Sequence, residues 1–233
     1  MNYAFFNALP KYIARALALL ICIPVHECAH GYTAYKLGDP TAKFSGRLTL
    51  NPLAHFDKIG CVCMVVFGIG WAKPVPVNPR YFKNPKWGMA ITAAAGPLSN
   101  FLMAFVAMIF YKAAFYPYYY GDVSVLKYIV LLLFYLVYLN ISLGIFNLMP
   151  VPPFDGSRIF GALLPDRIYW KIMRYERIIF IIVMLLMVTG SSTGIIERLS
   201  AVVFDGIDAV TRPVDNLMIK ILTSRLVTGG TAV

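Results

Sequence analysis

The stretch ALALLICIPVHECAHGYTAY, residues 16–35, places two histidines and a glutamate directly after an apolar run. His26 and His30 are four residues apart, which on a helix is a rotation of about 400°, so both imidazoles project from one face. Glu27 lies about 100° further round the helix than His26. Two histidines on one face can hold one divalent ion, and a neighbouring glutamate can hold a water beside that ion. The stretch therefore predicts a metal site on a helix, with zinc as the expected ion.

The composition is that of a membrane protein, because 59% of the residues are hydrophobic and only 14% are charged. A span needs about 20 consecutive apolar residues. Four segments are long enough to cross a bilayer or nearly so, namely residues 12–36, 88–111, 126–147 and 177–196. A fifth apolar run, residues 59–72, is too short to span comfortably.

The net charge of +10 does not indicate a nucleic-acid partner, because the basic residues are scattered over short loops between apolar runs. Most of the lysines and arginines fall in residues 36–58, 73–86 and 158–177. The positive-inside rule places these loops in the cytoplasm. Because both loops that flank residues 59–72 are basic, we expect that run to enter the membrane and return on the same side.

The histidines are predicted to lie inside the membrane. If Lys36 marks the cytoplasmic end of the first span, His30 is about 9 Å and His26 about 15 Å deeper. Ionisable groups at such depth are costly and usually functional. Pro24 leaves the carbonyl of Leu20 without its helical partner, which predicts a kink and a polar cavity at this level. The alternative is a chance His-Glu-x-x-His whose side chains face water.

A catalytic zinc site needs a third protein ligand. The candidates are His55, Asp39, Asp57, Asp155 and Asp166. Depth favours Asp155, which follows the third predicted span by eight residues and has apolar neighbours on both sides. An unpaired carboxylate there would be expensive, whereas a metal-bound one is satisfied. From the residues alone, a surface turn explains PVPPFDG, residues 150–156, equally well.

With HECAH in the first span and NLMPVPPFDG at residues 147–156, the sequence resembles the site-2 protease family of intramembrane zinc metalloproteases. The resemblance extends over most of residues 24–164. Three further stretches contribute to it: FSGRLTLNPLAHFDKIG (44–60), GWAKPVPVNPRYFKNPKWGM (70–89) and AAAGPLSN (93–100). His-Glu-x-x-His alone is moderately specific, but the ordered combination is highly specific.

The resemblance implies that His26, His30 and Asp155 bind one zinc ion per chain and that Glu27 is the acid/base residue. It also implies a membrane-spanning or membrane-anchored protein substrate, cut near the cytoplasmic side. Asn147 and Asn100 match positions expected near the site, where they could stabilise an oxyanion or position the substrate. For Asn100, a role in helix packing is equally consistent with the sequence.

We therefore expect an all-α polytopic membrane protein with about four to six transmembrane helices, a re-entrant segment and a small membrane-associated β-element. The β-element is predicted from SGRLTL and AKPVPVNP, where Val75 and Val77 alternate with prolines and could accept a substrate strand. A proline-rich surface loop is the alternative. We expect residues 1–196 to form the protease core, without a PDZ or CBS domain, and residues 197–233 to form an amphipathic tail.

The expected location is the cell (plasma) membrane, with several spans and the active site toward the cytoplasm. The expected partners are the lipid bilayer and a protein substrate, and a homo-oligomer is left open. The alternative functions are a transporter and a catalytically silent metal-binding membrane protein. A transporter would usually show paired repeats, which the sequence lacks. Metal holding alone does not require Glu27.

Overall fold

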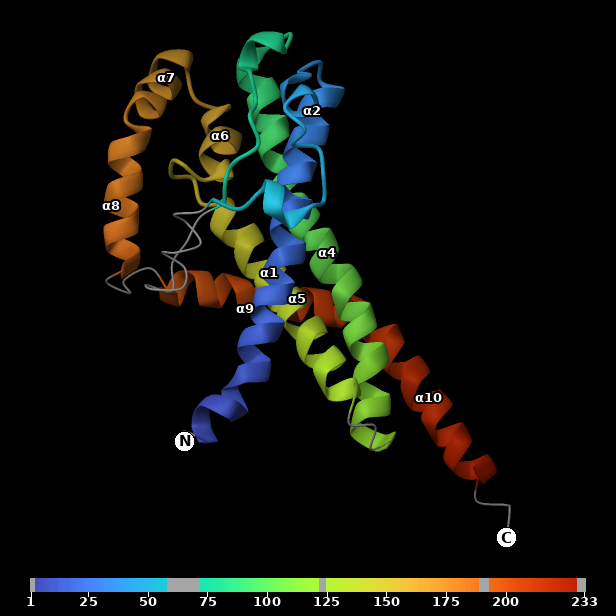
Figure 1. Cartoon of the computed structure of the whole chain (residues 1–233). Helices are drawn as coiled ribbons and strands as arrows, with labels where there is room; N and C mark the ends of the chain where they lie inside the picture. Colours follow the sequence, from blue (N-terminus) through green and yellow to red (C-terminus); the bar gives the residue numbers. More distant parts are fainter. Residues whose placement is uncertain (1–2, 58–71, 122–124, 189–192, 230–233) are drawn as a thin grey trace.

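Three long helices form the centre of the computed structural model, which describes residues 3–57, 72–121, 125–188 and 193–229. They are α1 (Tyr3–Lys36), α4 (Pro85–Gly121) and α5 (Leu126–Asn147). Figure 1 shows them crossing one another in a bundle. All three are long and apolar enough to cross a membrane, which confirms a helix of suitable length at each of the first three predicted spans.

Small side chains allow the three helices to approach closely. The buried core contains Ala18 and Cys22 of α1, Ala104 of α4, and Val137 and Ile141 of α5. Because lipid offers no hydrophobic driving force between helices, close packing of small residues is a main source of association in a membrane. The bundle thus holds α1 and α4 near enough for polar groups to meet between them.

Helix α4 continues ten residues beyond the predicted end of its span at residue 111. Aromatic residues four apart stabilise this extension, because side chains at that spacing are neighbours on a helix. The rings of Tyr111 and Phe115 stack with centroids 5.7 Å apart, and those of Phe115 and Tyr119 with centroids 5.8 Å apart.

Shorter elements surround one end of the bundle, where Lys36 ends α1. They are α2 (Thr41–Phe44), η1 (Pro52–Ala54), η2 (Pro79–Tyr81), α6 (Asp155–Gly161), α7 (Asp166–Arg174) and α8 (Glu176–Val188). In Figure 1, α6, α7 and α8 form an arm beside the bundle. Helices α9 (Thr193–Val210) and α10 (Arg212–Gly229) follow, with α9 against α5 and α10 against α4.

Two predicted membrane segments are not tested. Most of residues 59–72, the predicted re-entrant run, lies outside the described residues. The predicted span 177–196 begins with the 13-residue helix α8, but residues 189–192 are also outside the described part. The division into a core at 1–196 and a tail at 197–233 likewise stays a prediction.

The predicted β-element is wrong for the part of the chain that the structure describes. The β pairing there is an isolated antiparallel bridge between Phe56 and Ala72, and no sheet forms. Neither SGRLTL, residues 45–50, nor AKPVPVNP, residues 72–79, is a strand. The second segment is therefore a loop on the bundle.

The backbone groups that a ladder would need are engaged elsewhere or missing. Pro74 and Pro76 have no N–H to donate. The guanidinium of Arg47 donates to the carbonyl oxygens of Lys73, at 2.6 Å, and Pro74, at 3.3 Å. The N–H of Val75 donates to a side chain of the site described below. Alternating valines and prolines thus predict an extended segment without ensuring a partner strand.

A buried cation joins the C-terminal helices to the bundle. Lys112 of α4 has a side chain only 5% exposed, and its Nζ lies 2.9 Å from Asp208 Oδ1 and 2.6 Å from Asp215 Oδ2. Tyr116 donates its hydroxyl to Asp215 Oδ1 at 3.2 Å. Because Asp208 is in α9 and Asp215 is in α10, one lysine fixes both helices.

We expect Lys112→Met to loosen α9 and α10, because two carboxylates would lose their cation while the apolar length of the side chain is kept. Removing one partner of a buried ion pair costs about 3 kcal/mol at the lower end of the usual range. The lower end applies because Asp208 is 42% exposed. The measurement is thermal unfolding in detergent, and the control is Lys127→Met, at an exposed lysine of α5. Equal unfolding temperatures for both variants would contradict this role.

Candidate active site

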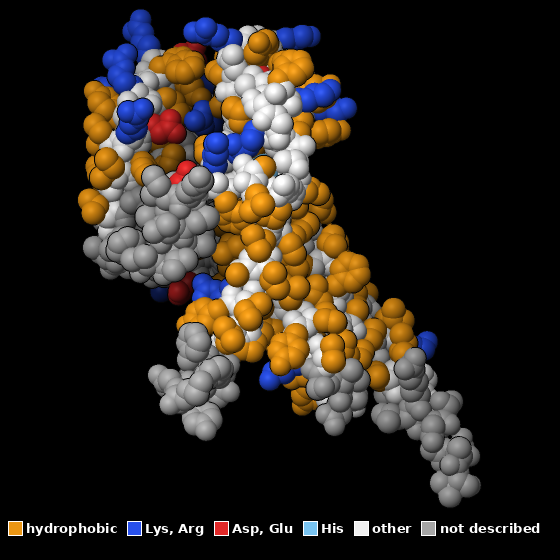
Figure 2. Space-filling model, viewed as in Figure 1, with side chains coloured by type: hydrophobic (Ala, Val, Ile, Leu, Met, Phe, Trp, Pro, Cys, Tyr) orange, Lys and Arg blue, Asp and Glu red, His pale blue; other side chains and the backbone are white. Residues whose placement is uncertain are grey.

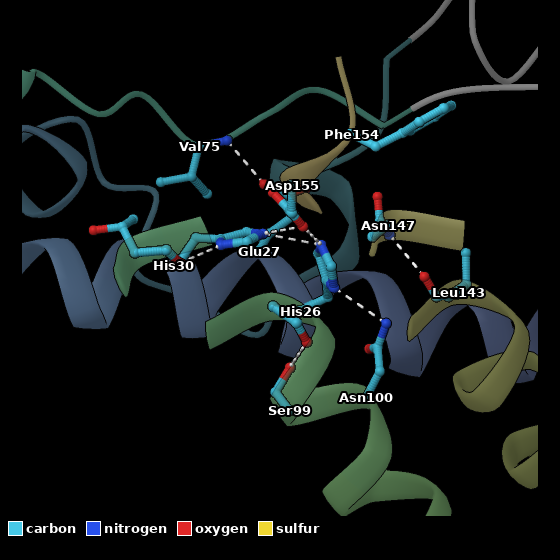
Figure 3. A network of polar contacts seen from close by, with 12 residues as sticks. His26, Glu27, His30, Val75, Ser99, Asn100, Leu143, Asn147, Phe154 and Asp155 are labelled. Carbon is cyan, nitrogen blue, oxygen red and sulfur yellow. Dashed lines mark hydrogen bonds and ion pairs between the residues drawn. The ribbon is translucent and has the colours of Figure 1, made fainter. Parts of the chain in front are cut away.

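Three metal-ligating side chains meet at one point between α1 and α6 (Figure 3). His26 and His30 come from consecutive turns of α1, and their Nε2 atoms lie 3.0 Å apart. Asp155 is the first residue of α6, and its Oδ2 lies 3.4 Å from His26 Nε2 and 3.2 Å from His30 Nε2. The two histidines are only 8% and 9% exposed. Distant parts of the sequence thus supply one buried donor set.

The donor set fits a zinc ion. Bonds of about 2.0–2.2 Å in a tetrahedral zinc site place neighbouring donor atoms about 3.3 Å apart. The three observed separations are 3.0, 3.2 and 3.4 Å. Oδ2 of Asp155 is buried and accepts no hydrogen bond, which is costly for a carboxylate oxygen unless a cation satisfies it. Two imidazole nitrogens and one carboxylate oxygen also leave the fourth position open, as in catalytic zinc sites.

The tautomer of His30 is set by α4. Its Nδ1 lies 2.8 Å from the backbone carbonyl oxygen of Thr92, to which it must donate. The lone pair of Nε2 then faces His26 and Asp155. Such outer hydrogen bonds fix the ring orientation of metal-binding histidines.

Asp155 is ionised at neutral pH. Burial, the largest single influence, raises its pKa, but the adjacent imidazoles of His26 and His30 together lower the pKa of this carboxyl to about 2. The carboxylate is therefore ready to bind a cation without first losing a proton.

The turn after α5 places Asp155. Ser157 Oγ donates to the carbonyl oxygen of Phe154 at 2.7 Å, which closes the first turn of α6. Gly156 packs so tightly on the backbone of Leu148 that a Cβ there would overlap its carbonyl oxygen. Helix α6 is thereby pressed against the end of α5, with Asp155 directed at the histidines.

Gly96 of α4 faces both histidines at close range. A Cβ at this position would overlap Nε2 and Cε1 of His30 and Cε1 of His26. Glycine therefore gives both rings the space they occupy. Small residues in membrane helices commonly mark such close contacts.

Glu27 lies beside the histidines and faces the loop between Ala72 and Asn78. Its Oε2 accepts a hydrogen bond from the backbone N–H of Val75 at 2.9 Å. This bond holds one carboxylate oxygen in place and leaves the other available. The arrangement suits a glutamate that exchanges protons with a water near the metal.

A cavity of about 600 Å³ opens onto the site, which is large enough for a peptide segment. Its walls come from α1, the loop at residues 74–79, α4, the end of α5, and α6 to α8. The lining residues are His26, Glu27, His30, Pro74, Val75, Val77, Pro79, Met89, Thr92, Ala93, Asn147, Pro153, Asp155, Arg158, Tyr169, Trp170, Met173 and Glu176.

The two asparagines occupy different places. Asn147 lines the cavity, and its Nδ2 donates to the carbonyl oxygen of Leu143 at 3.0 Å. Asn100 does not line the cavity and is fully buried, with its Nδ2 3.1 Å from His26 Nδ1. Only Asn147 is thus placed to meet a substrate.

The other candidates for the third ligand lie outside the metal cluster of the described residues. Asp39 accepts hydrogen bonds from the backbone N–H groups of Thr41, at 3.0 Å, and Asn78, at 2.7 Å. Asp166 pairs with Lys86 at 3.0 Å.

The two remaining candidates, His55 and Asp57, are also outside the cluster. His55 is fully buried, and its Nε2 lies 2.7 Å from the carbonyl oxygen of Thr49. The depth argument therefore selected the residue that lies with the histidines.

Several residues of the site were not found from the sequence. They are the carbonyl of Thr92, Gly96, and the cavity residues Arg158, Tyr169 and Glu176. The run of small residues before Gly96 was a usable signal, because it predicts a close helix contact. The last three carry no such signal, because the placement of α6 brings Arg158 to the cavity and the path of α7 and α8 brings Tyr169 and Glu176 there.

A two-histidine, one-carboxylate site beside three helices of membrane-spanning length defines a membrane metalloprotein. The sequence profile of Peptidase family M50 matches residues 14–127 and 114–190, so the chain belongs to this family. This confirms the resemblance to the site-2 proteases.

Three relatives are similar to this chain. YwhC of Bacillus subtilis is 40% identical over 175 residues, which cover 74% of this chain and 79% of YwhC. Rip2 of Mycolicibacterium smegmatis is 28% identical over 155 residues, which cover 63% of this chain and 54% of Rip2. MJ0392 of Methanocaldococcus jannaschii is 29% identical over 151 residues, which cover 65% of this chain and 34% of MJ0392. MJ0392 is named a zinc metalloprotease, and the other two bear that name provisionally. No solved structure matches the chain.

We expect Gly96→Ala to lower zinc affinity about 10-fold or more, because the added methyl would displace both imidazole rings. Affinity is measured by competition with a chelator in detergent. The control is Gly206→Ala in α9, where a Cβ would meet open space and the helix would gain up to about 1 kcal/mol. Unchanged zinc affinity in Gly96→Ala would show that the rings do not bind the ion in this arrangement.

Proposed function

We propose that this chain is an intramembrane zinc metalloprotease that hydrolyses peptide bonds of membrane-spanning or membrane-anchored proteins. The observation that carries the proposal is the convergence of His26, His30 and Asp155, with Glu27 beside them, on a cavity between helices of membrane-spanning length. Membership of Peptidase family M50 supports it.

His26, His30 and Asp155 would hold the zinc ion. When bound, zinc polarises the scissile carbonyl and makes water acidic enough to react near neutral pH. Glu27 accepts the proton of the attacking water and returns it to the leaving amine. The hydrogen bond from Val75 to Oε2 keeps this carboxylate at the cavity wall and leaves Oε1 for the proton.

Asn147 is proposed to stabilise the charge that develops on the substrate oxygen. It lines the cavity, and one N–H of its amide is held by Leu143. A carboxamide has two such hydrogens, so the second is available to an oxyanion.

The substrate is proposed to lie extended along residues 74–77. Val75 already gives its N–H to Glu27, but in the described part of the chain the N–H of Val77 has no hydrogen bond. Val77 lines the cavity. One backbone hydrogen bond from Val77 could therefore hold a substrate segment that has unwound, without a formed sheet.

We propose that the protein lies in the cell membrane and that its active site faces the cytoplasm. Figure 2 shows lysine and arginine side chains gathered at the end of the molecule that carries the arm of α6, α7 and α8. An apolar surface covers much of the bundle below. Helix α1 ends here with Lys36, and α4, which contains Lys86, begins here (Figure 1). Basic loops remain in the cytoplasm, which supports the orientation.

A transporter or a silent metal-binding protein would need no base beside the metal. The bond between Glu27 and Val75 favours the protease, because it fixes a carboxylate at the cavity next to the ligands.

We expect Glu27→Gln to retain zinc and to lower the cleavage rate of a detergent-solubilised spanning substrate about 100- to 10,000-fold. The amide keeps the shape of the side chain but cannot accept a water proton. The control is Glu197→Gln, at an exposed glutamate of α9, which should cleave at the wild-type rate. Wild-type cleavage by Glu27→Gln would exclude the assigned role.

We expect Val77→Pro to raise KM for a protein substrate about 2- to 12-fold, because it removes one backbone donor worth about 0.5–1.5 kcal/mol. Zinc content should not change. Val77→Ile keeps the donor and should keep the wild-type KM. An unaltered KM in Val77→Pro would mean that the substrate does not bind along this segment.

A further inference from the structure

Asn100 is a buried polar residue that the cleavage mechanism does not use. It lies on α4, has no exposed surface and does not line the cavity, and its carboxamide is directed at the His26 ring (Figure 3). The nearer carboxamide atom, Nδ2, is 3.1 Å from His26 Nδ1. Oδ1 is buried and has no hydrogen-bond partner among the described residues.

The protonation of His26 determines which carboxamide atom must face it. Nε2 of His26 is the atom that points to His30 and Asp155, so its lone pair must be free for a metal. A neutral imidazole with a free Nε2 carries its proton on Nδ1. Nδ1–H then faces Asn100 as a donor, and an NH₂ group opposite it would leave two donors in contact.

A half-turn of the carboxamide removes this conflict. The nitrogen and oxygen of an amide have nearly the same shape, and their assignment rests on the hydrogen-bond network. With Oδ1 in the place of Nδ2, which lies 3.1 Å from His26 Nδ1, the imidazole proton has an acceptor.

The spacing on α4 supports the same conclusion. Thr92, Gly96 and Asn100 are four residues apart, so they lie on one face of the helix. Thr92 accepts the proton of His30, Gly96 makes room for both rings, and Asn100 faces His26. Each histidine then has one oxygen acceptor from this face.

We propose that Asn100 is a positioning residue, whose carboxamide oxygen accepts the Nδ1 proton of His26 and orients its Nε2 toward the metal. This proposal rests on the metal site of the proposed function and gives Asn100 a role distinct from that of Asn147. Asn100 contacts His26, a proposed zinc ligand, and does not line the cavity in which a substrate would bind.

The test compares the zinc affinities of Asn100→Leu and Asn100→Asp by chelator competition in detergent. Leucine removes the acceptor at similar volume, and we expect a loss of about 10- to 100-fold, as for other outer partners of metal-binding histidines. Aspartate can only accept, so zinc affinity should stay within about 3-fold of wild type or increase. If Asn100 instead donated through Nδ2, aspartate would weaken zinc binding as much as leucine, and that result would overturn the proposal.

The matched control is Asn140→Leu. Asn140 of α5 is also fully buried, but its Nδ2 donates to Cys22 Sγ and the carbonyl oxygen of Leu136. We expect this variant to unfold at lower temperature and to bind zinc with wild-type affinity. If Asn140→Leu lost as much zinc affinity as Asn100→Leu, general loosening would explain both, and the assigned role would be wrong.

A second readout on the same variants is the absorption of the cobalt-substituted protein. The visible absorption of the Co²⁺-substituted protein should change in Asn100→Leu and return in Asn100→Asp, since it reports the ligand geometry of the ion. If the leucine variant does not fold, the affinity of the aspartate variant decides alone. Absence of cleavage by wild-type protein would refute the protease function, but it would leave the zinc affinities and the role of Asn100 intact.

Discussion

The close approach of His26, His30 and Asp155 is the constraint on which the rest of the structure depends. Their three donor atoms lie within 3.4 Å of one another in a largely buried place, and two lone-pair nitrogens facing a carboxylate oxygen need a cation between them. Each neighbouring element serves this arrangement. Helix α1 presents both rings on one face, α4 leaves space at Gly96, and the end of α5 directs α6 at them.

The residues that would orient the zinc ligands are different from the residues that would act on a substrate. The groups that face the outer sides of the histidines, Thr92, Gly96 and Asn100, all lie on α4. Glu27, Asn147 and Val77, which line the cavity, come from α1, α5 and the loop at residues 74–79. The residues proposed to orient the metal ligands and those proposed to act on the substrate therefore come from different elements. The cavity lies between the bundle and the helices α6 to α8, near the end of the molecule that carries many basic residues (Figure 2).

The sequence was sufficient for the features that depend on local periodicity and depth. Apolar runs located α1, α4 and α5, the four-residue spacing put His26 and His30 on one face, and depth selected Asp155. It was not sufficient where a residue's role depends on what another segment supplies. The segment around Val75 does not pair as a strand, because Arg47 and Glu27 already form hydrogen bonds with its backbone groups. Lys112 and Asp215 are 103 residues apart, and their ion pair depends on where α10 packs, which the sequence does not indicate. Gly96 was only partly predictable. Its small neighbours indicated a close helix contact, but they did not indicate that the histidines make this contact.

The most direct test of the metal site is zinc X-ray absorption on the purified, zinc-loaded protein in lipid. We expect one zinc per chain with only nitrogen and oxygen neighbours at about 2.0–2.2 Å, including the outer-shell scattering of two imidazoles. In Asp155→Asn the same spectrum should show a changed first shell while both imidazoles remain. Sulfur scattering at about 2.3 Å, or a spectrum that Asp155→Asn leaves unaltered, would contradict the assignment of these three ligands.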